Sequence, residues 1–569
     1  MSENVQLLAP CATEYRVTLT QNIATLKGRS PMRRWNGWGD ENTEFPLAPA
    51  AVEFLRHRLG SGRVLPEAGL EEVCARVPES RLPSHPLVET EPEVRVRHAR
   101  GQSLPDWLAM RSGDFGCFPD GVARPENSDQ VRALLDWALR EQVRVIPYGG
   151  GTSVVGHINP PALDAPVLTL SLARMDRLLA LDPESRLARF GAGVTGPSLE
   201  AQLRERGYVL GHFPQSWELS TLGGWVASRS SGQQSLRYGR IEQLFAGGRV
   251  ETPRGRLDIP TIPASSAGPD LRELVLGSEG RLGVITEAEV RISALPEHES
   301  FHVAFLPDRH AGIRLVREIA QARLPLSMLR LSNGEETRTQ LILAGHERAV
   351  GLLERYLALR GCGQDKCMLT FGVTGDRRAA RQVLAEARRR IRAAGGVDTG
   401  RLLGRKWEQS RFRSPYLRHG LWEQGYAVDT LETCADWARI PALMDSVEQA
   451  IRDNAGEGEQ AHVFTHLSHV YPQGSSLYTT YVFRCGESYE ATRERWRAMK
   501  GAASDAIVAG GGTISHQHGV GRDHAPWLVH EKTREGLAVL DRLFAHFDPE
   551  HRLNPGCMLE EQDDAGTAS

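Results

Sequence analysis

Long apolar runs, closely spaced cysteine pairs and a signal peptide pattern are all absent from this sequence. No stretch approaches 18 consecutive apolar residues, so we expect no membrane-spanning helix. Eight cysteines are scattered without a CxxC pair, which predicts reduced thiols in the cytoplasm and neither a disulfide framework nor a zinc site. The N-terminal residues lack a basic region followed by an apolar block, so we expect no signal peptide.

Lysine is almost missing as well. Only five of the 68 basic residues are lysines, and 71 acidic residues bring the net charge to −3. A chain this close to neutral has no overall field that favours nucleic acid. Arginine binds carboxylate and phosphate through a rigid fork, but a bias of composition is the simpler explanation of the surplus, because abundance does not locate a phosphate site. The 569 residues are enough for roughly two to four globular domains.

Helix and strand patterns alternate along most of the chain. Apolar residues at 131, 134, 135 and 138 predict a helix over 129–141, and short strands are expected at 143–147 and 167–170. Glycine-rich loops stop near residue 300, after which strand and helix patterns alternate to about 396. The pattern indicates an α+β fold with mixed sheets and a domain boundary near 297–300.

Three glycine-rich segments carry the strongest chemical signal. The first, PYGGGTSVVG at 147–156, follows a predicted strand, and its three consecutive glycines let backbone N–H groups approach an anion. The same letters fit a simple turn, and neither a Walker lysine nor a GxGxxG helix start accompanies them. The second segment, at 214–239, and the third, GSEGRLGVITE at 277–287, are weak alone but specific in this order and spacing.

The order of these segments resembles the FAD-binding domain of the vanillyl-alcohol-oxidase (PCMH) type. The resemblance implies that the first loop holds the FAD pyrophosphate and that the later segments hold the isoalloxazine and ribityl groups. Relatives with covalent flavin often carry His or Cys near the glycine loop. This chain has Thr152 and Ser153 there, so we expect non-covalent FAD, with His157 and His212 as the nearest alternatives for attachment. The residues assigned to the cofactor by this resemblance are Pro147, Gly149, Gly150, Gly151, Thr152, Ser153, Gln215, Ser220, Thr221, Gly223, Gly224, Trp225, Ser228, Gly239, Glu279, Gly280, Gly283, Val284 and Ile285.

An aromatic cluster near the N-terminus, RRWNGWGD at 33–40, narrows the family. By itself it predicts an aromatic clip that packs the N-terminal arm on the body. It also resembles the alkylglycerone-phosphate synthase (alkyldihydroxyacetonephosphate synthase) family of ether-lipid synthesis, and the likeness runs from about residue 31 to 558. The resemblance implies exchange of the acyl group of 1-acyl-dihydroxyacetone phosphate for a long-chain fatty alcohol, an FAD-dependent alkyl transfer without net redox change.

That resemblance also assigns catalytic residues. Tyr478 matches the proton-transferring tyrosine, and Arg330 matches an essential arginine that also binds the substrate. The family carries three consecutive histidines before GVG. Here they are His516, Gln517 and His518, and glutamine cannot shuttle a proton. Tyr478, His516, His518 and Arg330 are therefore the predicted catalytic residues.

A basic segment at 404–418 gives a weaker match, in which Lys406 binds the substrate. Arg405, Arg411, Arg413 and Arg418 crowd the same segment. Several arginines so close together could clamp a phosphate, or they could coat a solvated helix.

The rival interpretation is an FAD-dependent 2-hydroxy-acid dehydrogenase or oxidase of the glycolate or D-lactate type. Those enzymes commonly bind a divalent metal through HxGDGNxH and a Glu before HG. Here Tyr478 and Gln517 stand at two of those ligand positions, and no GDGN occurs. A phenol and an amide are poor ligands for such ions, so we expect no metal, although His462, His466 and His469 could form a cluster. A flavin-binding module without catalysis is disfavoured because the catalytic matches are present.

We therefore expect an α+β fold in which a PCMH-type FAD-binding domain carries an α/β cap (substrate) domain. The expected parts are an N-terminal helical arm (1–97), the FAD-binding domain (98–297), the cap (298–510) and a C-terminal segment that returns to the flavin site (511–569). The expected partners are small-molecule lipid substrates and no nucleic acid. Family precedent adds a homodimer and peripheral contact with a membrane.

Overall fold

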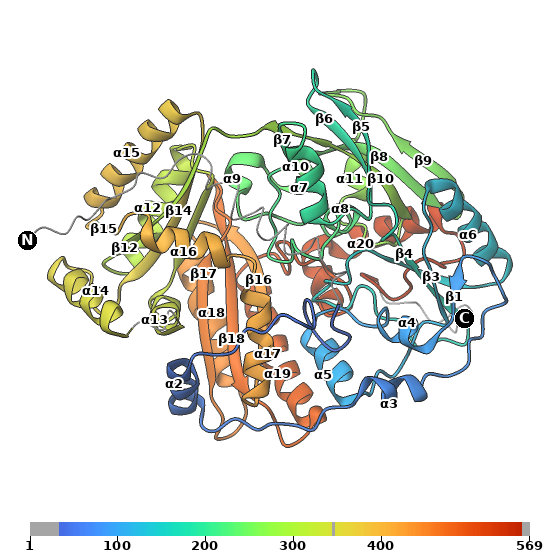
Figure 1. The fold of residues 1–569 in the computed structure, drawn as a ribbon, viewed down its shortest axis with the longest axis horizontal. Helices are drawn as coiled ribbons and strands as arrows, with labels where there is room; N and C mark the ends of the chain where they lie inside the picture. The colour runs from blue at the N-terminus through green and yellow to red at the C-terminus, as the bar shows by residue number, and fades with distance from the viewer. Residues whose placement is uncertain (1–32, 344–346, 560–569) are drawn as a thin grey trace, which may run out of the picture.

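The computed structural model describes residues 33–343 and 347–559. Residues 1–32 of the predicted arm and 560–569 of the predicted C-terminal segment lie outside these ranges. Figure 1 shows two regions of mixed strand and helix side by side, with the seven-stranded sheet in one and the remaining strands in the other. The predicted α+β content is confirmed. Within the described ranges, no helix is long and apolar enough to cross a membrane.

Three sheets form the region that precedes residue 295. The first has four strands in the order β1-β2-β4-β3, with β2 and β3 parallel to β4. The second has five strands, all antiparallel, in the order β5-β6-β10-β8-β9. A two-stranded sheet joins β7 to β11. The strands are β1 (Val88–Glu89), β2 (Gly121–Ala123), β3 (Arg144–Tyr148), β4 (Val167–Ser171), β5 (Leu178–Asp182), β6 (Leu187–Gly191), β7 (Tyr208–Val209), β8 (Phe245–Thr252), β9 (Gly255–Ile259), β10 (Val284–Arg291) and β11 (Ser293–Ala294).

The helix predicted at 129–141 is confirmed as α6 (Ser128–Arg140). Asn127 caps it by accepting a hydrogen bond from the Gln130 N–H, and the apolar residues at 131, 134, 135 and 138 are buried on one face. The expected strands at 143–147 and 167–170 are β3 and β4. They pair in parallel, so β3 delivers the glycine loop to one end of its sheet.

A seven-stranded antiparallel sheet dominates the second region, in the order β15-β12-β14-β13-β17-β18-β16. All nine residues of β14 are buried, because the strand lies between β12 and β13 inside the sheet and helices α12, α13 and α15 pack against it. The strands are β12 (His298–Leu306), β13 (Met328–Ser332), β14 (Cys367–Gly375), β15 (Val397–Asp398), β16 (Tyr426–Asp436), β17 (Ala461–Leu467) and β18 (Gly474–Arg484).

Helices surround both regions (Figure 1). Those before residue 295 are α2 (Pro49–Leu59), α3 (Leu70–Ala75), α4 (Pro92–Val96), α5 (Leu104–Ser112), α6, α7 (Gly196–Arg204), α8 (Leu222–Ser228), α9 (Ser235–Tyr238), α10 (Ile241–Leu244) and α11 (Arg272–Val275). Those after it are α12 (Arg309–Gln321), α13 (Gly334–Leu343), α14 (Glu347–Leu359), α15 (Arg377–Ala393), α16 (Leu402–Ser410), η2 (Ser414–Tyr416), α17 (Leu417–Glu423), α18 (Ile440–Asp453), α19 (Tyr489–Ala509), η3 (Ala525–Trp527) and α20 (Leu528–Phe547).

The core packing of α5 and of the C-terminal residues bears on the expected domain boundaries. Trp107 of α5 packs in the hydrophobic core of the seven-stranded region, although the expected boundary at 98 assigns it to the flavin domain. Leu553 and Cys557 pack in the core of the other region, where Leu553 forms a bridge with Val145 of β3. The domain limits stay a proposal, and the packing of α5 favours a first boundary closer to β2.

The aromatic clip predicted at 33–40 is present. The backbone N–H of Trp38 donates to His419 Nε2 at 3.2 Å, and Gln102 Nε2 donates to the Gly37 carbonyl oxygen at 3.2 Å. A Cβ on Gly37 would lie 2.4 Å from His419 Cε1, so the chain can approach this closely only with glycine there. The clip attaches the segment before α2 to α17.

Candidate active site

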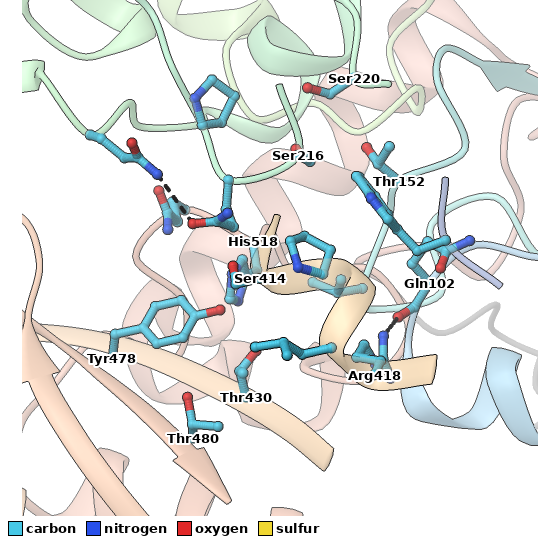
Figure 2. A pocket seen from close by; sticks show the side chains of 18 of the residues that line it. Gln102, Thr152, Ser216, Ser220, Ser414, Arg418, Thr430, Tyr478, Thr480 and His518 are labelled. Atoms are coloured by element: carbon cyan, nitrogen blue, oxygen red, sulfur yellow. Dashed lines mark hydrogen bonds between the residues drawn. The ribbon is translucent and has the colours of Figure 1, made fainter. Parts of the chain in front are cut away.

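A cavity of about 960 Å³ runs between the glycine loops and the seven-stranded sheet. It is lined by the glycine loop after β3, by parts of the two later glycine-rich segments, by strands β13, β16, β17 and β18, and by helices α2, α13, α16 and α17. Figure 2 shows Tyr478, His518 and Arg418 facing this space, with Thr152 and Ser220 on the side of the glycine loops. A volume of this size accommodates a cofactor together with a substrate.

The glycine loop leaves no room for side chains. A Cβ on Gly150 would lie 1.9 Å from the Leu219 carbonyl oxygen, so the first glycine-rich segment packs directly on the second. Gly151 has φ +64°, a conformation that favours glycine. Among the described residues, no group accepts a hydrogen bond from the backbone N–H groups of Gly149–Ser153. Five free donors beside the cavity fit a pyrophosphate.

The Glu279 carboxylate ties the glycine loop to the segment at 510–521. Ser153 Oγ lies 2.8 Å from His157 Nδ1, and His157 Nε2 lies 3.0 Å from Glu279 Oε2. The same carboxylate accepts from the N–H groups of Val520 and Gly521 at 2.6 and 2.7 Å. Burial opposes its ionisation, but His157 and these donors hold the pKa of Glu279 below its usual value. The ring of His157 therefore lies between the Ser153 hydroxyl and the Glu279 carboxylate.

All but two of the residues predicted to contact the cofactor line the cavity. The exceptions are Gly239, which ends α9 at φ +92° and packs on Gln243, and Val284, which is buried in β10. Cofactor contact by Gly239 and Val284 is therefore not supported. His212 is also buried off the cavity, where its Nε2 lies 2.8 Å from Ser230 Oγ.

Tyr478 lies in the middle of β18, as the predicted strand requires, and faces the cavity (Figure 2). Its ring stacks on His466 at 4.9 Å, and the ring of His518 meets it edge to face at 5.8 Å. Burial raises the pKa of Tyr478 to about 12, so the phenol stays protonated at neutral pH. Burial lowers the pKa of His518, so the imidazole beside it stays neutral.

The two predicted catalytic histidines are separated by the fold. His518 lines the cavity and His516 does not. His516 Nδ1 lies 3.0 Å from Glu432 Oε1, and its Nε2 accepts from Arg240 Nη1 at 2.6 Å and lies 2.7 Å from the Tyr471 hydroxyl. Direct contact of His516 with a substrate is therefore not supported; it can act only through its neighbours.

Glu432, His469 and His516 form a buried cluster whose ligand-type atoms all lie within 4.8 Å of one another. Burial opposes ionisation of Glu432, but the neighbouring His516 holds its pKa well below the usual range. Burial lowers the pKa of His469 to about 3. The Arg240 guanidinium on His516 already supplies a positive charge here, which disfavours a metal cation. That this cluster binds no metal remains a prediction.

Arg330 lines the cavity from β13 but is already paired. Its Nη2 donates to Glu336 Oε1 at 2.5 Å and lies 3.1 Å from His466 Nδ1. Burial opposes ionisation of Glu336, but His466 and Arg330 bring its pKa down to about 2. The pair is close to neutral, so Arg330 is a poor site for a dianionic phosphate.

Arg418 at the start of α17 is the site residue that sequence reasoning did not single out. It is half-buried beside the cavity, donates to the carbonyl oxygens of Gln102 and Val428 at 2.6 and 3.4 Å, and lies 4.5 Å above the Trp107 ring. In the described chain no carboxylate lies within 4.0 Å of it. Only the run of arginines at 405–418 pointed to it, and nothing local separates it from its neighbours.

One lobe of the cavity is apolar. It lies between α2, α13, α17 and β16, and most of its wall comes from residues far apart in the sequence. The wall residues are Phe45, Leu47, Ala51, Phe54, Leu55, Leu341, Leu343, Leu417, Leu421, Val428 and Val482. None of these was predicted, because each looks like an ordinary core residue until the fold brings them together.

Two family models match the chain. One described as FAD binding domain covers residues 119–258, and one described as FAD linked oxidases, C-terminal domain, covers 295–558. The chain is 30% identical to a curated alkyldihydroxyacetonephosphate synthase of Dictyostelium discoideum, over 81% of this chain and 77% of the relative. It is 28% identical to a protein of the same name from Trypanosoma brucei brucei, over 92% of each.

A solved structure of alkyldihydroxyacetonephosphate synthase superposes with a TM-score of 0.79 at 26% identity, over 92% of this chain and 98% of that one. The glycolate oxidase subunit GlcD of Bacillus subtilis is 26% identical over 78% of this chain and 90% of its own length. The similarity to alkyldihydroxyacetonephosphate synthases thus extends over up to 92% of this chain, against 78% for GlcD.

Proposed function

This chain belongs to the alkyldihydroxyacetonephosphate synthase family, and from that premise we propose that it exchanges the acyl group of 1-acyl-dihydroxyacetone phosphate for a long-chain fatty alcohol. The bond from carbon 1 to the acyl oxygen breaks, and a bond from carbon 1 to the alcohol oxygen forms. The fatty acid leaves with the acyl oxygen, and the proton of the alcohol is released. There is no net oxidation, although the enzyme depends on FAD.

The observation that carries this proposal is the apolar lobe of the same cavity that Tyr478 and His518 line. A long alkyl chain gains about 0.8 kcal/mol for each methylene that it buries in such a lobe. A two- or three-carbon hydroxy acid has nothing to place there. The lobe therefore favours a lipid substrate over the rival 2-hydroxy-acid oxidation.

Tyr478 and His518 move the proton at the reacting carbon. When bound, FAD supplies the electron-accepting ring beside which the exchange takes place. The phenol of Tyr478 holds a proton at neutral pH, and the neutral ring of His518 can accept one. Stacking on His466 fixes the plane of the Tyr478 ring, and the exposed edge of Arg330 is available to the substrate carbonyl.

The experiment that tests the proposal is incubation of the FAD-loaded protein with acyl-dihydroxyacetone phosphate and labelled hexadecanol. We expect labelled ether product together with free fatty acid. Absence of labelled ether would overturn the proposal. Bleaching of the flavin by D-lactate or glycolate without oxygen would instead support the rival oxidoreductase.

We propose that the FAD is bound without a covalent link, and predict that acid precipitation releases all of it. Support comes from His157, whose ring lies between Ser153 Oγ at 2.8 Å and the Glu279 carboxylate at 3.0 Å, and from His212, which is buried off the cavity. The measurement is flavin absorbance in the supernatant against the washed pellet. Yellow colour that stays with the pellet would contradict the prediction, and His157→Ala would then show whether that residue carries it.

The length of the alcohol is set by α2 in this proposal, so we predict that Ala51→Phe shortens the preferred alcohol. Ala51 is buried on the cavity wall, and a phenyl ring there occupies space that the alkyl chain needs. Displacing two methylenes costs roughly tenfold in the ratio of kcat/KM for hexadecanol to that for decanol. Val52→Phe, on the same helix but off the cavity, is the control. An unchanged ratio in Ala51→Phe would remove α2 from substrate selection.

Peripheral membrane contact is proposed at α14. Leu352, Tyr356 and Leu359 are exposed there at i, i+4 and i+7, on one face of a helix that also carries Arg348 and Arg355 and is followed by Arg360. Changing these three residues to serine is expected to reduce co-sedimentation with anionic phospholipid vesicles several-fold. Val539→Ser removes an equally exposed apolar side chain from α20 and is the control. Equal sedimentation of both variants would contradict the proposal.

A homodimer and a cytoplasmic location complete the proposed function. The family resemblance supports the first, and the reduced cysteines support the second. Analytical ultracentrifugation of the FAD-bound protein tests the dimer.

A further inference from the structure

A buried arginine with no anionic partner lines the cavity among aromatic side chains that do not belong to the apolar lobe. Arg411, just after α16, is 6% exposed and lines the cavity. Its guanidinium carbon lies 4.8 Å from the ring centroids of both Phe213 and Phe412, with Phe301 and Trp407 within 5.8 Å. Aromatic faces stabilise a cation but leave its N–H groups without acceptors.

No hydrogen bond uses those N–H groups in the described chain, and Nη1 is fully buried without a partner. No described carboxylate lies within 4.0 Å of Arg411; Glu408 on the same helix and Glu200 act on it only from further away. A buried guanidinium with unused donors is costly in the free protein. Such a group is expected where a ligand supplies the missing anion.

Two neighbouring basic residues, Lys406 and Arg413, form with Arg411 a positive corner of the cavity that extends towards solvent. Lys406 and Arg413 line the cavity beside Arg411, are exposed, and form no ion pair with any described residue. Ser410 and Ser414 line the same stretch, and the Ser410 hydroxyl already donates to the Lys406 carbonyl oxygen at 2.9 Å. Two cations and the Ser414 hydroxyl around a buried arginine match a phosphate dianion, which needs several donors.

The other cavity arginines are less suited to a phosphate. Arg330 is neutralised by Glu336 at 2.5 Å. Arg418 is held by the Gln102 carbonyl oxygen and lies in the part of the cavity that contains Tyr478, where the reacting carbon belongs (Figure 2). The lining of the cavity thus combines an apolar lobe with an unpaired positive corner.

We propose that Arg411, with Lys406 and Arg413, forms the subsite for the phosphate monoester of the substrate. The inference rests on the proposed function, in which the substrate joins an alkyl or acyl chain to a dihydroxyacetone phosphate head. The chain occupies the apolar lobe while the phosphate occupies the positive corner. Arg330 is left for the carbonyl end of the substrate.

The test is titration of the FAD-bound protein with dihydroxyacetone phosphate and with dihydroxyacetone, followed by calorimetry and by the flavin absorbance spectrum. Arg411→Gln is expected to weaken binding of the phosphate ester at least tenfold and to leave dihydroxyacetone unchanged. Because Arg411→Gln removes a buried group and could fail to fold, the exposed pair Lys406→Gln/Arg413→Gln is a second variant, with an expected loss of roughly three- to tenfold. Arg405→Gln removes the same charge from the same helix off the cavity and is the control.

Three results would overturn the subsite. The variants could bind dihydroxyacetone phosphate as Arg405→Gln does, or lose both ligands equally, or lose FAD, in which case the anion is the cofactor pyrophosphate. Failure of the proposed function has a different signature: the wild-type protein makes no labelled ether, yet still binds dihydroxyacetone phosphate through Arg411.

Discussion

Tyr478→Phe is expected to abolish ether formation while the protein stays folded and keeps its FAD. The phenol hydroxyl is the protonated group at the centre of the cavity, and phenylalanine preserves the ring that stacks on His466. Loss of a positioned general acid or base lowers the rate by about 10²- to 10⁴-fold. The measurement is kcat for labelled ether, with the flavin spectrum and the melting temperature of the same sample.

Tyr471→Phe is the matched control. It removes a hydroxyl that lies 2.7 Å from His516 and does not line the cavity. We expect only a modest fall in kcat, because His516 keeps its contacts with Glu432 and Arg240. Full activity in Tyr478→Phe, or an equal loss in both variants, would remove Tyr478 from the proton transfer.

The parts of the site that the sequence could predict are those carried by short motifs. The glycine loop follows directly from a strand. Its glycines are needed because a Cβ on Gly149, Gly150 or Gly151 would lie 2.4, 1.9 or 2.1 Å from an oxygen of Thr221, Leu219 or Tyr148, respectively. Gly239 and Val284 belong to the same motifs but face away from the cavity. A motif shows that a segment is present at a site, and the backbone path then decides which of its residues face the ligand.

The different roles of His516 and His518 could not be predicted. Two residues apart, they look equivalent in sequence. The structure separates them because Glu432, 84 residues earlier, and Arg240, 276 residues earlier, hold His516 beneath the wall of the cavity. The apolar lobe escaped prediction for the same physical reason, since α2, α13 and α17 meet only through tertiary packing.

The pairing of Arg330 with Glu336 leads to the last prediction, that Arg330→Met destabilises the protein and that a second substitution restores its stability. Breaking the pair leaves a carboxylate 3% exposed without its cation, at a cost of about 3 kcal/mol or more in the free energy of unfolding. His466, 3.1 Å from Glu336, can become protonated and offset part of this cost. Arg330→Met/Glu336→Gln removes both charges, so we expect stability within about 1 kcal/mol of wild type.

The pH dependence of the free energy of unfolding distinguishes loss of this ion pair from a simple loss of packing. The pKa of Glu336 is about 2 in the folded protein, below its unfolded value near 4.5. The stability it contributes is therefore fully present above pH 4.5 and is lost as the pH falls from 4.5 towards 2. The double variant lacks this carboxylate, so its free energy of unfolding should depend less on pH in that window. Denaturant titration at several pH values measures this dependence.

Activity of the double variant then separates two roles for Arg330. If the guanidinium serves only to neutralise Glu336, removing both charges restores ether formation along with stability. We expect instead that stability returns while kcat/KM stays at least tenfold low, because about a quarter of the Arg330 side chain remains exposed to the cavity and can donate to the substrate carbonyl. Recovery of both properties would reduce Arg330 to a positioning residue for His466 and Tyr478.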